Sequence, residues 1–168
     1  MEPQMVRRAA FGHQDPQSAH DAAHGFPVGT HILTDTGPVA VETLTAGDLV
    51  LTRNGGAQPI LSVDTVTRRA RAIKFSEACF GRTGPICDML LPEEQPVLIR
   101  DWRARALFGQ SQAMVCAGQL VDDTFIHDIG PRRFLLFRLD LGRARVVQGF
   151  GIDLGTAAQA SSPVRAVA

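Results

Sequence analysis

Residues 25–52 are GFPVGTHILTDTGPVAVETLTAGDLVLT, and no other stretch specifies the architecture so clearly. Apolar and β-branched residues alternate here with smaller or polar ones, which is the pattern of half-buried strands. The pattern predicts strands at residues 31–34, 39–44 and 49–52. Gly, Pro, Asn and Asp form turn clusters after these strands, at residues 35–38, 46–48 and 54–56.

Farther along the chain, short strands recur between turn signals, which is typical of an all-β domain. They are predicted at residues 58–66, 72–75, 89–91, 96–99, 113–116, 134–139 and 144–148. A basic segment, residues 67–71, is expected to be a solvated turn, and residues 140–143 form a hairpin signal with a glycine. Residues 101–110 mix apolar residues with arginines, so they fit either a turn of helix or an irregular arm. A short helical turn is expected at residues 117–121.

The composition limits the class of protein. The chain has 168 residues, of which 45% are hydrophobic, an ordinary fraction for one buried core. Its formal net charge is zero, so charge gives no support to non-specific binding of nucleic acid or of an anionic membrane. No apolar run reaches the roughly 18 residues of a membrane-spanning helix, so we expect no membrane insertion.

Both ends of the sequence differ from the middle. Residues 1–24 are polar and lack the apolar core of a secretory signal, which leaves a cytoplasmic location and leaderless secretion as open expectations. Residues 155–168 are rich in Ala and Ser. We therefore expect a domain at residues 25–154 between two flexible tails, 1–24 and 155–168.

Neither the cysteines nor the histidines predict a metal site, and no cofactor is expected. The cysteines contain no CxxC pair, so reduced, partly buried thiols are expected at Cys79, Cys87 and Cys116. Three histidines at the start of the chain have no acidic or Cys ligand fixed beside them: His13, His20 and His24.

The opening stretch resembles a known family. Its fixed points are GFxxGTxIxT at 25–34, VExL at 41–44 and GDxVxT at 47–52. Together they resemble the start of a Hint (Hedgehog/intein) domain, and most closely its bacterial branch. The resemblance can be followed from Gly25 to Leu154, and it implies a horseshoe-like all-β fold of short strands and hairpins.

The resemblance also implies a chemistry. A working Hint domain uses a Cys or Ser at its first position to attack the preceding carbonyl, a His to protonate the leaving amine, and donors to polarise the amide. The nucleophile slot, just before the Phe of the motif, is Gly25 here. The later family box, Asp-Leu-x-x-Ser-Pro-x-His-x-Val-Leu, matches residues 88–98, so its Ser slot is Pro92 and its His slot is Gln95.

These three residues lack the groups that the reaction needs. Gly25 has no side chain, Pro92 has neither a hydroxyl nor an N–H, and Gln95 has no proton that titrates near neutral pH. We therefore expect no catalytic residues in these slots. Residues that could substitute for them are weaker candidates: Thr30, His31, Cys116 and His127, the last with Asp122, Asp123 and Asp128 around it.

Three hypotheses follow. The first is a degenerate, non-catalytic Hint-like domain with a structural or interaction role, for which a protein partner is conceivable. The second is an active autoprocessing domain that performs an acyl shift and cleaves itself with an unorthodox nucleophile. The third is a binder of a peptide or small molecule in the former active-site cleft. The placement of the family's site at these positions, on which the first hypothesis depends, expects Gly25 and Gln95 to lie close together.

Overall fold

The computed structural model describes residues 23–53, 55–77, 79–81, 85 and 87–156, which are built mainly from antiparallel strands. The strands are β1 (Phe26–Pro27), β2 (His31–Thr34), β3 (Gly37–Ala40), β4 (Leu49–Thr52), β5 (Gly56–Pro59), β6 (Ser62–Phe75), β7 (Met89–Pro92), β8 (Pro96–Ile99), β9 (Ala113–Cys116), β10 (Ile126–Asp140), β11 (Val146–Gly149) and β12 (Ile152–Gly155). The helical elements are η1 (Val41–Thr43), α2 (Trp102–Phe108) and η3 (Ala117–Leu120). The predicted all-β class is confirmed.

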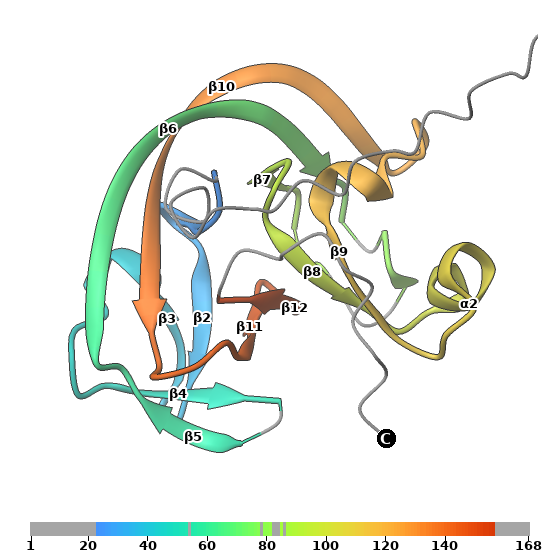
Figure 1. The fold of residues 1–168 in the computed structure, drawn as a ribbon. Coiled ribbons are helices and arrows are strands. Elements are labelled where there is room, and N and C mark those ends of the chain that lie inside the picture. The colour runs from blue at the N-terminus through green and yellow to red at the C-terminus, as the bar shows by residue number, and fades with distance from the viewer. Residues whose placement is uncertain (1–22, 54, 78, 82–84, 86, 157–168) are drawn as a thin grey trace, which may run out of the picture.

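The strands form two sheets. One has the order β1-β10-β6-β7, and the other has the order β3-β2-β4-β11-β12-β8-β9, with β5 paired to β4. In the first sheet, β6 and β10 run side by side as a long curved ribbon that arches over one side of the molecule (Figure 1). Among the described residues, no helix is both long enough and apolar enough to cross a membrane.

The ribbon corrects the expectation of a basic turn at residues 67–71. These residues lie in the middle of β6, which is a single strand of 14 residues. Its partner β10 has 15 residues, so His127 and Asp128 lie on a strand and not on a loop. Residues 67–71 contain neither Gly nor Pro, and β10 pairs with β6 along this part of the strand. A register shift between Asp128 and Pro131 introduces an irregularity in β10.

Two other strand boundaries differ from the prediction. The strand expected at 39–44 ends at Ala40, because the Val41 N–H donates to the Thr30 carbonyl (2.8 Å) and begins the 3₁₀ turn η1. The strand expected at 58–66 is divided between β5 and β6, with a break after Pro59. Of the other predicted strands, those at 31–34, 49–52, 96–99 and 113–116 have the expected bounds. The strand expected at 72–75 is the end of β6, and those expected at 89–91, 134–139 and 144–148 correspond to β7, β10 and β11 with shifted bounds.

The segment from Asp101 to Gly109 is a short helix, which decides between the two alternatives for residues 101–110. The Asp101 carboxylate caps the N-terminus by accepting a hydrogen bond from the Arg103 N–H (3.0 Å), and Gly109 ends the helix in the left-handed conformation with φ 67°. Arg103 is buried and donates to the Asp101 carboxylate and the Cys79 carbonyl, which attaches the helix to the body of the fold.

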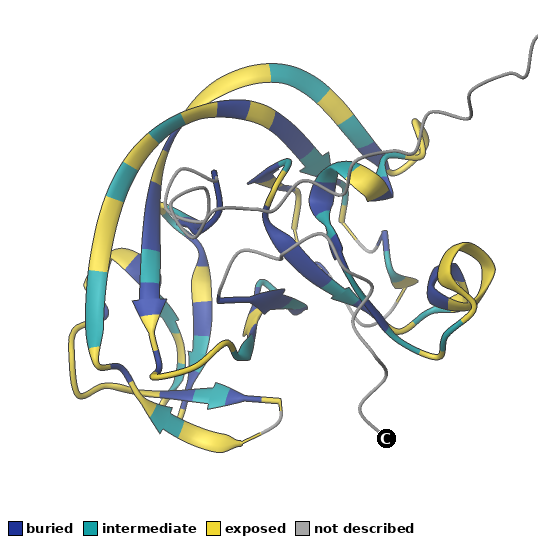
Figure 2. Ribbon diagram, viewed as in Figure 1, coloured by how far each residue is buried: buried dark blue, intermediate teal, exposed yellow. Residues whose placement is uncertain are grey.

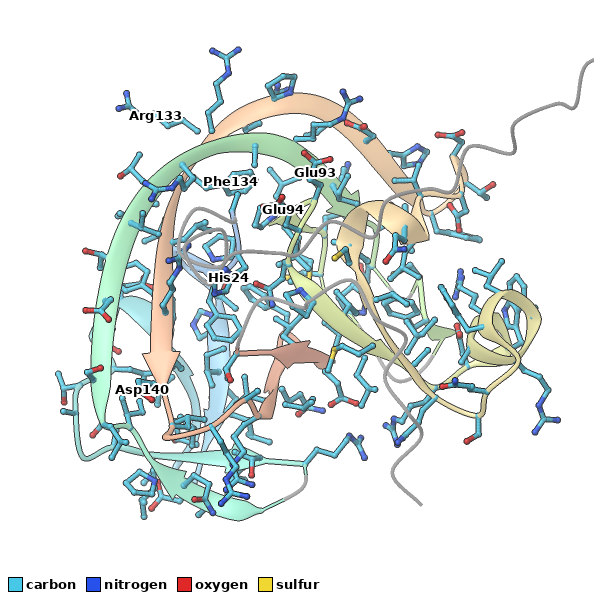
Figure 3. All side chains as sticks on the ribbon, in the orientation of Figure 1. His24, Glu93, Glu94, Arg133, Phe134 and Asp140 are labelled. Atoms are coloured by element: carbon cyan, nitrogen blue, oxygen red, sulfur yellow. The ribbon has the colours of Figure 1, made fainter. Side chains whose placement is uncertain are left out.

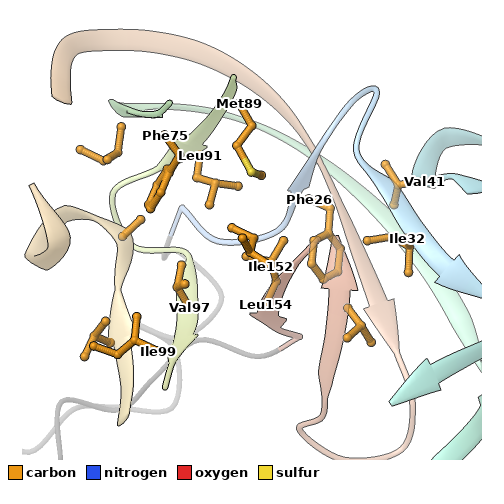
Figure 4. Close-up of a cluster of buried hydrophobic side chains, with 14 of the residues drawn as sticks. Phe26, Ile32, Val41, Phe75, Met89, Leu91, Val97, Ile99, Ile152 and Leu154 are labelled. Carbon is orange, nitrogen blue, oxygen red and sulfur yellow. The ribbon is translucent and has the colours of Figure 1, made fainter. Parts of the chain in front are cut away.

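Two apolar clusters lie beneath these sheets, as the dark residues of Figure 2 indicate. The larger one joins both sheets, and Phe26 and Leu154 point into it from opposite ends of the described chain (Figure 4). A smaller cluster lies against the ribbon and consists of Ala23, Ala70, Ala72, Phe134 and Leu136.

The packed region includes residues that the sequence assigned to the two tails. Ala23, His24, Gly155 and Thr156 are buried, and Gly155 belongs to β12. Ala23 and His24 come shortly before β1, Gly155 is the last residue of β12, and Thr156 follows it. The buried region therefore extends one or two residues beyond each end of 25–154. The remaining tail residues, 1–22 and 157–168, lie outside the described residues.

Candidate functional site

Gly25 and Gln95 lie next to each other, as expected. The Gly25 N–H donates to Gln95 Oε1 at 2.9 Å, although 70 residues separate them in the sequence. Gln95 follows the β7 strand, and its backbone N–H donates to the Pro92 carbonyl (3.0 Å) while its carbonyl accepts from Ala117 N–H (2.9 Å). The side chain is 0% exposed, so this contact is in the interior of the protein.

The orientation of the Gln95 amide is fixed by its other partners. Its Nε2 donates to the Pro96 carbonyl at 3.0 Å and to the Gly155 carbonyl at 2.9 Å. Because carbonyl oxygens only accept, the NH₂ group must face them and the oxygen must face Gly25. One buried side chain thus connects the start of β1, the start of β8 and the end of β12.

Gly25 is closely packed against β10. Its φ is +135°, and a Cβ atom at this position would lie 3.0 Å from Leu136 Cβ and 3.1 Å from the Phe137 carbonyl oxygen. Both distances are shorter than ordinary contacts, and the conformation disfavours any residue other than glycine. A side chain at this position therefore requires β10 or β1 to move.

The peptide bond between His24 and Gly25 is held from both sides. Its N–H donates to Gln95, as described, and its carbonyl accepts a hydrogen bond from Arg138 Nε at 3.2 Å. Burial lowers the pKa of Arg138, and the positive charge of Arg68 contributes in the same direction. One residue earlier, Ala23 N–H donates to the Glu94 carboxylate. We call this peptide bond, with the side chains of Gln95 and Arg138, the junction.

The junction lies on the inner side of the ribbon. Figure 3 shows His24 and Glu94 beneath the arch of β6 and β10. Pro92, in the Ser slot of the family box, ends β7 opposite Ala72 of β6 and contributes only its carbonyl to Gln95. Arg138 and Gly155 were not anticipated from the sequence, because no local pattern indicates a contact between residues so far apart.

Two of the substitute candidates lie on or before β2. The Thr30 hydroxyl donates to the Pro27 carbonyl at 2.7 Å, and the residue is only 2% exposed. His31 is exposed; its Nδ1 lies 3.0 Å from the Gly29 carbonyl, and its ring lies against Phe150 with the centroids 5.5 Å apart. Both side chains therefore have local partners, and the Thr30 hydroxyl proton is occupied.

Cys116 and His127 do not form a thiol–imidazole pair in the described part of the chain. Cys116 is the N-cap of η3, where its backbone N–H donates to Gln119 Oε1 at 2.9 Å, and burial raises its thiol pKa, with the negative charges of Glu94 and Glu93 adding to the effect. The Nε2 of His127 lies 3.1 Å from the Thr124 carbonyl. The cysteines are free thiols, and burial raises the pKa of Cys79 to about 11. A high pKa disfavours the nucleophilic thiolate.

Two of the three carboxylates named with His127, those of Asp122 and Asp128, are engaged elsewhere. Asp122 accepts hydrogen bonds from three backbone N–H groups, those of Thr124, Phe125 and Ile126, and Asp128 pairs with Arg71 (2.7 Å). Burial by itself would raise the Asp122 pKa, but these bonds and the one from Arg103 lower it. Within the described ranges, no group of three or more His, Cys, Asp and Glu residues is arranged to hold a metal ion.

Solved structures with the same fold are inteins and an intein-like domain. The solution structure of a bacterial intein-like domain from Clostridium thermocellum has a TM-score of 0.52 and 19% identity, and the match covers 82% of this chain and 100% of that one. The crystal structure of the Ssp DnaB mini-intein variant M86 has a TM-score of 0.50 and 10% identity, with 82% of this chain and 96% of that one covered. The fold is therefore the intein-like, Hint-type all-β fold.

The sequence profile of the Hint domain matches residues 24–160. The chain belongs to the Hint domain family. No curated protein sequence matches it.

Proposed function

We propose that this Hint domain does not process itself and serves a structural or interaction role. The observation that carries the proposal is the packing of the junction. Gly25 offers no nucleophile, and a Cβ there would lie 3.0 Å from Leu136 Cβ. The absence of a nucleophile is therefore accompanied by a backbone arrangement in which a side chain would force neighbouring atoms of β10 to shift.

The hydrogen bonds of the junction also oppose the reaction. Cleavage of the peptide bond requires a proton for the leaving amine, but Gln95 Oε1 accepts from the Gly25 N–H and its amide protons are directed to other carbonyls. A positioned general acid contributes about 10²–10⁴ in rate, and an activated nucleophile is needed as well. Without either group, the arrangement stabilises the ordinary planar amide.

One observation favours the second candidate, an autoprocessing domain with an unorthodox nucleophile. Arg138 Nε donates to the His24 carbonyl at 3.2 Å, which is the position from which a donor would polarise this carbonyl for attack. A polarised carbonyl is cleaved only if a nucleophile attacks it. The Thr30 hydroxyl, the candidate nearest in sequence, already donates to the Pro27 carbonyl. The third candidate, binding within the cleft at Gly25 and Gln95, is disfavoured because both residues are buried.

The decisive experiment is intact-mass measurement of the purified full chain. It is incubated with dithiothreitol and separately with hydroxylamine across a range of pH, with an active intein treated in parallel as a positive control. We expect one species of unchanged mass, apart from trimming at the ends. A fragment pair that corresponds to a break between His24 and Gly25, and that disappears in Arg138→Met, would establish the second candidate instead.

A further inference from the structure

The strongest unassigned feature is a concentration of arginines on the arch of the ribbon. Four of them line a hollow of about 490 Å³ together with Thr67 and Pro131, and we call these four the basic ridge: Arg68, Arg69, Arg132 and Arg133. None of the described residues that line this hollow carries a carboxylate. The chain as a whole has no net charge, so the ridge is a local excess of positive charge.

The strand register places two of these arginines directly opposite each other. Arg69 of β6 pairs with Arg133 of β10 in the antiparallel ladder, and both are exposed. Like charges at directly opposed positions destabilise a sheet by a few tenths of a kcal/mol to about 1 kcal/mol. Asp128, the carboxylate that precedes Arg133 along β10, is already bound to Arg71. An anionic partner would remove this repulsion.

A second hollow continues from the ridge and is different in character. It measures about 380 Å³, shares Arg132 and Arg133 with the ridge, and lies between β1 and β7, the two end strands of the sheet. Most of its lining is apolar, and we call it the apolar groove: Pro27, Val28, Met89, Leu90, Phe134 and Phe150, with Gly29, Thr30 and Asp88. Val28 is 56% exposed and Leu90 is 40% exposed.

Asp88 is the single carboxylate among the described residues of the groove, and it does not repel an acidic ligand strongly. Asp88 pairs with Lys74 at 3.2 Å and accepts a hydrogen bond from the Glu77 N–H at 2.8 Å. Its charge is therefore already balanced by groups beside the groove. Figure 3 shows Arg133 directed outward from the ribbon and Phe134, its neighbour in sequence, directed to the inside, so the two surfaces meet at β10.

From these contacts we infer that the basic ridge and the apolar groove together bind an acidic peptide segment of a partner protein. Its carboxylates contact the arginines of the ridge, and its aliphatic side chains occupy the groove. The inference rests on the interaction role proposed above and specifies the chemistry of the partner. Charge complementarity selects an anion, since exposed arginines bind carboxylates in a fork-like geometry.

The lining of the groove favours a peptide over a nucleic acid. Single-stranded nucleic acids bind by stacking bases on exposed aromatic faces. Of the two phenylalanines in the groove, Phe134 is only 7% exposed, and Phe150 is half-buried with its ring against His31. The most exposed apolar side chains, Val28 and Leu90, are aliphatic. Aliphatic surface of this kind accommodates the side chains of a peptide, which alternate along an extended segment.

The test measures binding of labelled probes to the full chain by fluorescence anisotropy at low and high salt. The probes are three peptides of equal length, alternating Glu with Val, Gln with Val, and Glu with Ser, and a single-stranded oligothymidylate of equal charge. The variant is R69Q/R133Q, and the matched control is R105Q/R143Q, which removes the same charge at exposed positions on α2 and after β10.

We expect the Glu/Val peptide to bind more tightly than the other probes. Its affinity should fall at high salt, because salt screens the charges. R69Q/R133Q should weaken its binding by about fivefold to tenfold, and the control by less than about twofold. No binding of this peptide, or equal losses in variant and control, overturns the inference, and tighter binding of the oligothymidylate replaces it with a nucleic-acid surface. The intact mass of each sample is measured afterwards, so that self-cleavage, which would contradict the proposed function, is detected separately from failure to bind.

Discussion

The junction lies on the inner side of the ribbon and Arg133 of the basic ridge is directed outward (Figure 3), and the two regions differ in how their polar groups are satisfied. At the junction, every described polar atom of the Gln95 side chain has a protein partner, and the residue is 0% exposed. On the ridge, Arg69 and Arg133 face each other across the ladder and are exposed. The junction is a network of satisfied hydrogen bonds, whereas Arg69 and Arg133 form no ion pair with another described residue.

The contrast between the two regions indicates where the domain can contact another molecule. A buried and satisfied network resists change, because removing any partner leaves another polar group without one. An exposed excess of one charge gains from a partner of opposite charge. The comparison therefore supports the proposal of a structural role for the slots that the sequence resemblance matches to the family's reaction centre, and of contact with other molecules at the arginines.

The largest effect is expected at Gln95. Gln95→Ala removes hydrogen bonds to Gly25, Pro96 and Gly155 and leaves a cavity, so it should lower the free energy of unfolding by about 3–5 kcal/mol. Chemical denaturation of the full chain measures this. Gln148→Ala, on the exposed side of β11, is the control and should change stability by less than about 0.5 kcal/mol. Equal effects would show that the junction network is not a centre of stability.

The second-largest loss of stability is expected at Gly25. Gly25→Ala combines a strained φ of +135° with a Cβ 3.0 Å from Leu136, and should destabilise the fold by about 2–4 kcal/mol. Gly47→Ala is the matched control, since Gly47 has a φ of +96° but no atom within 4 Å of an added Cβ. It should cost about 1–2 kcal/mol, from the backbone alone. If the two variants were equally stable, close packing against β10 would not explain the glycine.

These two residues also show how much of the site was accessible from the sequence. The family motifs placed Gly25 and Gln95 together, although 70 residues separate them, and the structure gives a hydrogen bond of 2.9 Å. Arg138 and Gly155 were missed, because their contacts join distant segments and depend on the exact course of β10 and β12. Local patterns contain no information on such pairs until the strand pairing is known.

The same reason explains the errors in the fold. Short strands at the start of the chain were predicted from alternation and turn residues, which act locally. The segment at 67–71 contains three arginines and was predicted to be a solvated turn, yet it is the middle of β6. Its strand conformation is stabilised by pairing with β10, more than 50 residues later in the sequence, and that pairing overrides the local preference.

An intermediate loss of stability is expected at Asp122. Its side chain carries a charge, as those of the ridge do, although of opposite sign, and it accepts several hydrogen bonds, as Gln95 does at the junction. Its pKa is lowered in the folded protein, because hydrogen bonds outweigh burial, so its contribution is present above the unfolded-state value near 4 and is lost as pH falls through the lower folded value. Asp122→Asn should therefore reduce stability at neutral pH by up to about 1 kcal/mol, after allowance for solvent screening.

The pH dependence provides the check on Asp122. Thermal unfolding is measured between neutral pH and strongly acidic pH for the wild type, D122N and D35N, the last in the exposed turn between β2 and β3. The difference between wild type and D122N should shrink as the pH falls below about 4, because the wild-type carboxylate is then protonated. A difference that is independent of pH would show that the effect arises from packing and not from the charge.

The smallest effect, and one of opposite sign, is expected on the ridge. R69Q/R133Q removes a like-charged pair from directly opposed positions, so it should raise the free energy of unfolding by a few tenths of a kcal/mol to about 1 kcal/mol. R105Q/R143Q should leave stability within about 0.5 kcal/mol of the wild type. If the ridge variant gains stability while it loses affinity for the Glu/Val peptide, the arginines oppose folding and act in binding. If it loses stability, their charge is balanced within the domain, and the contrast between ridge and junction no longer holds.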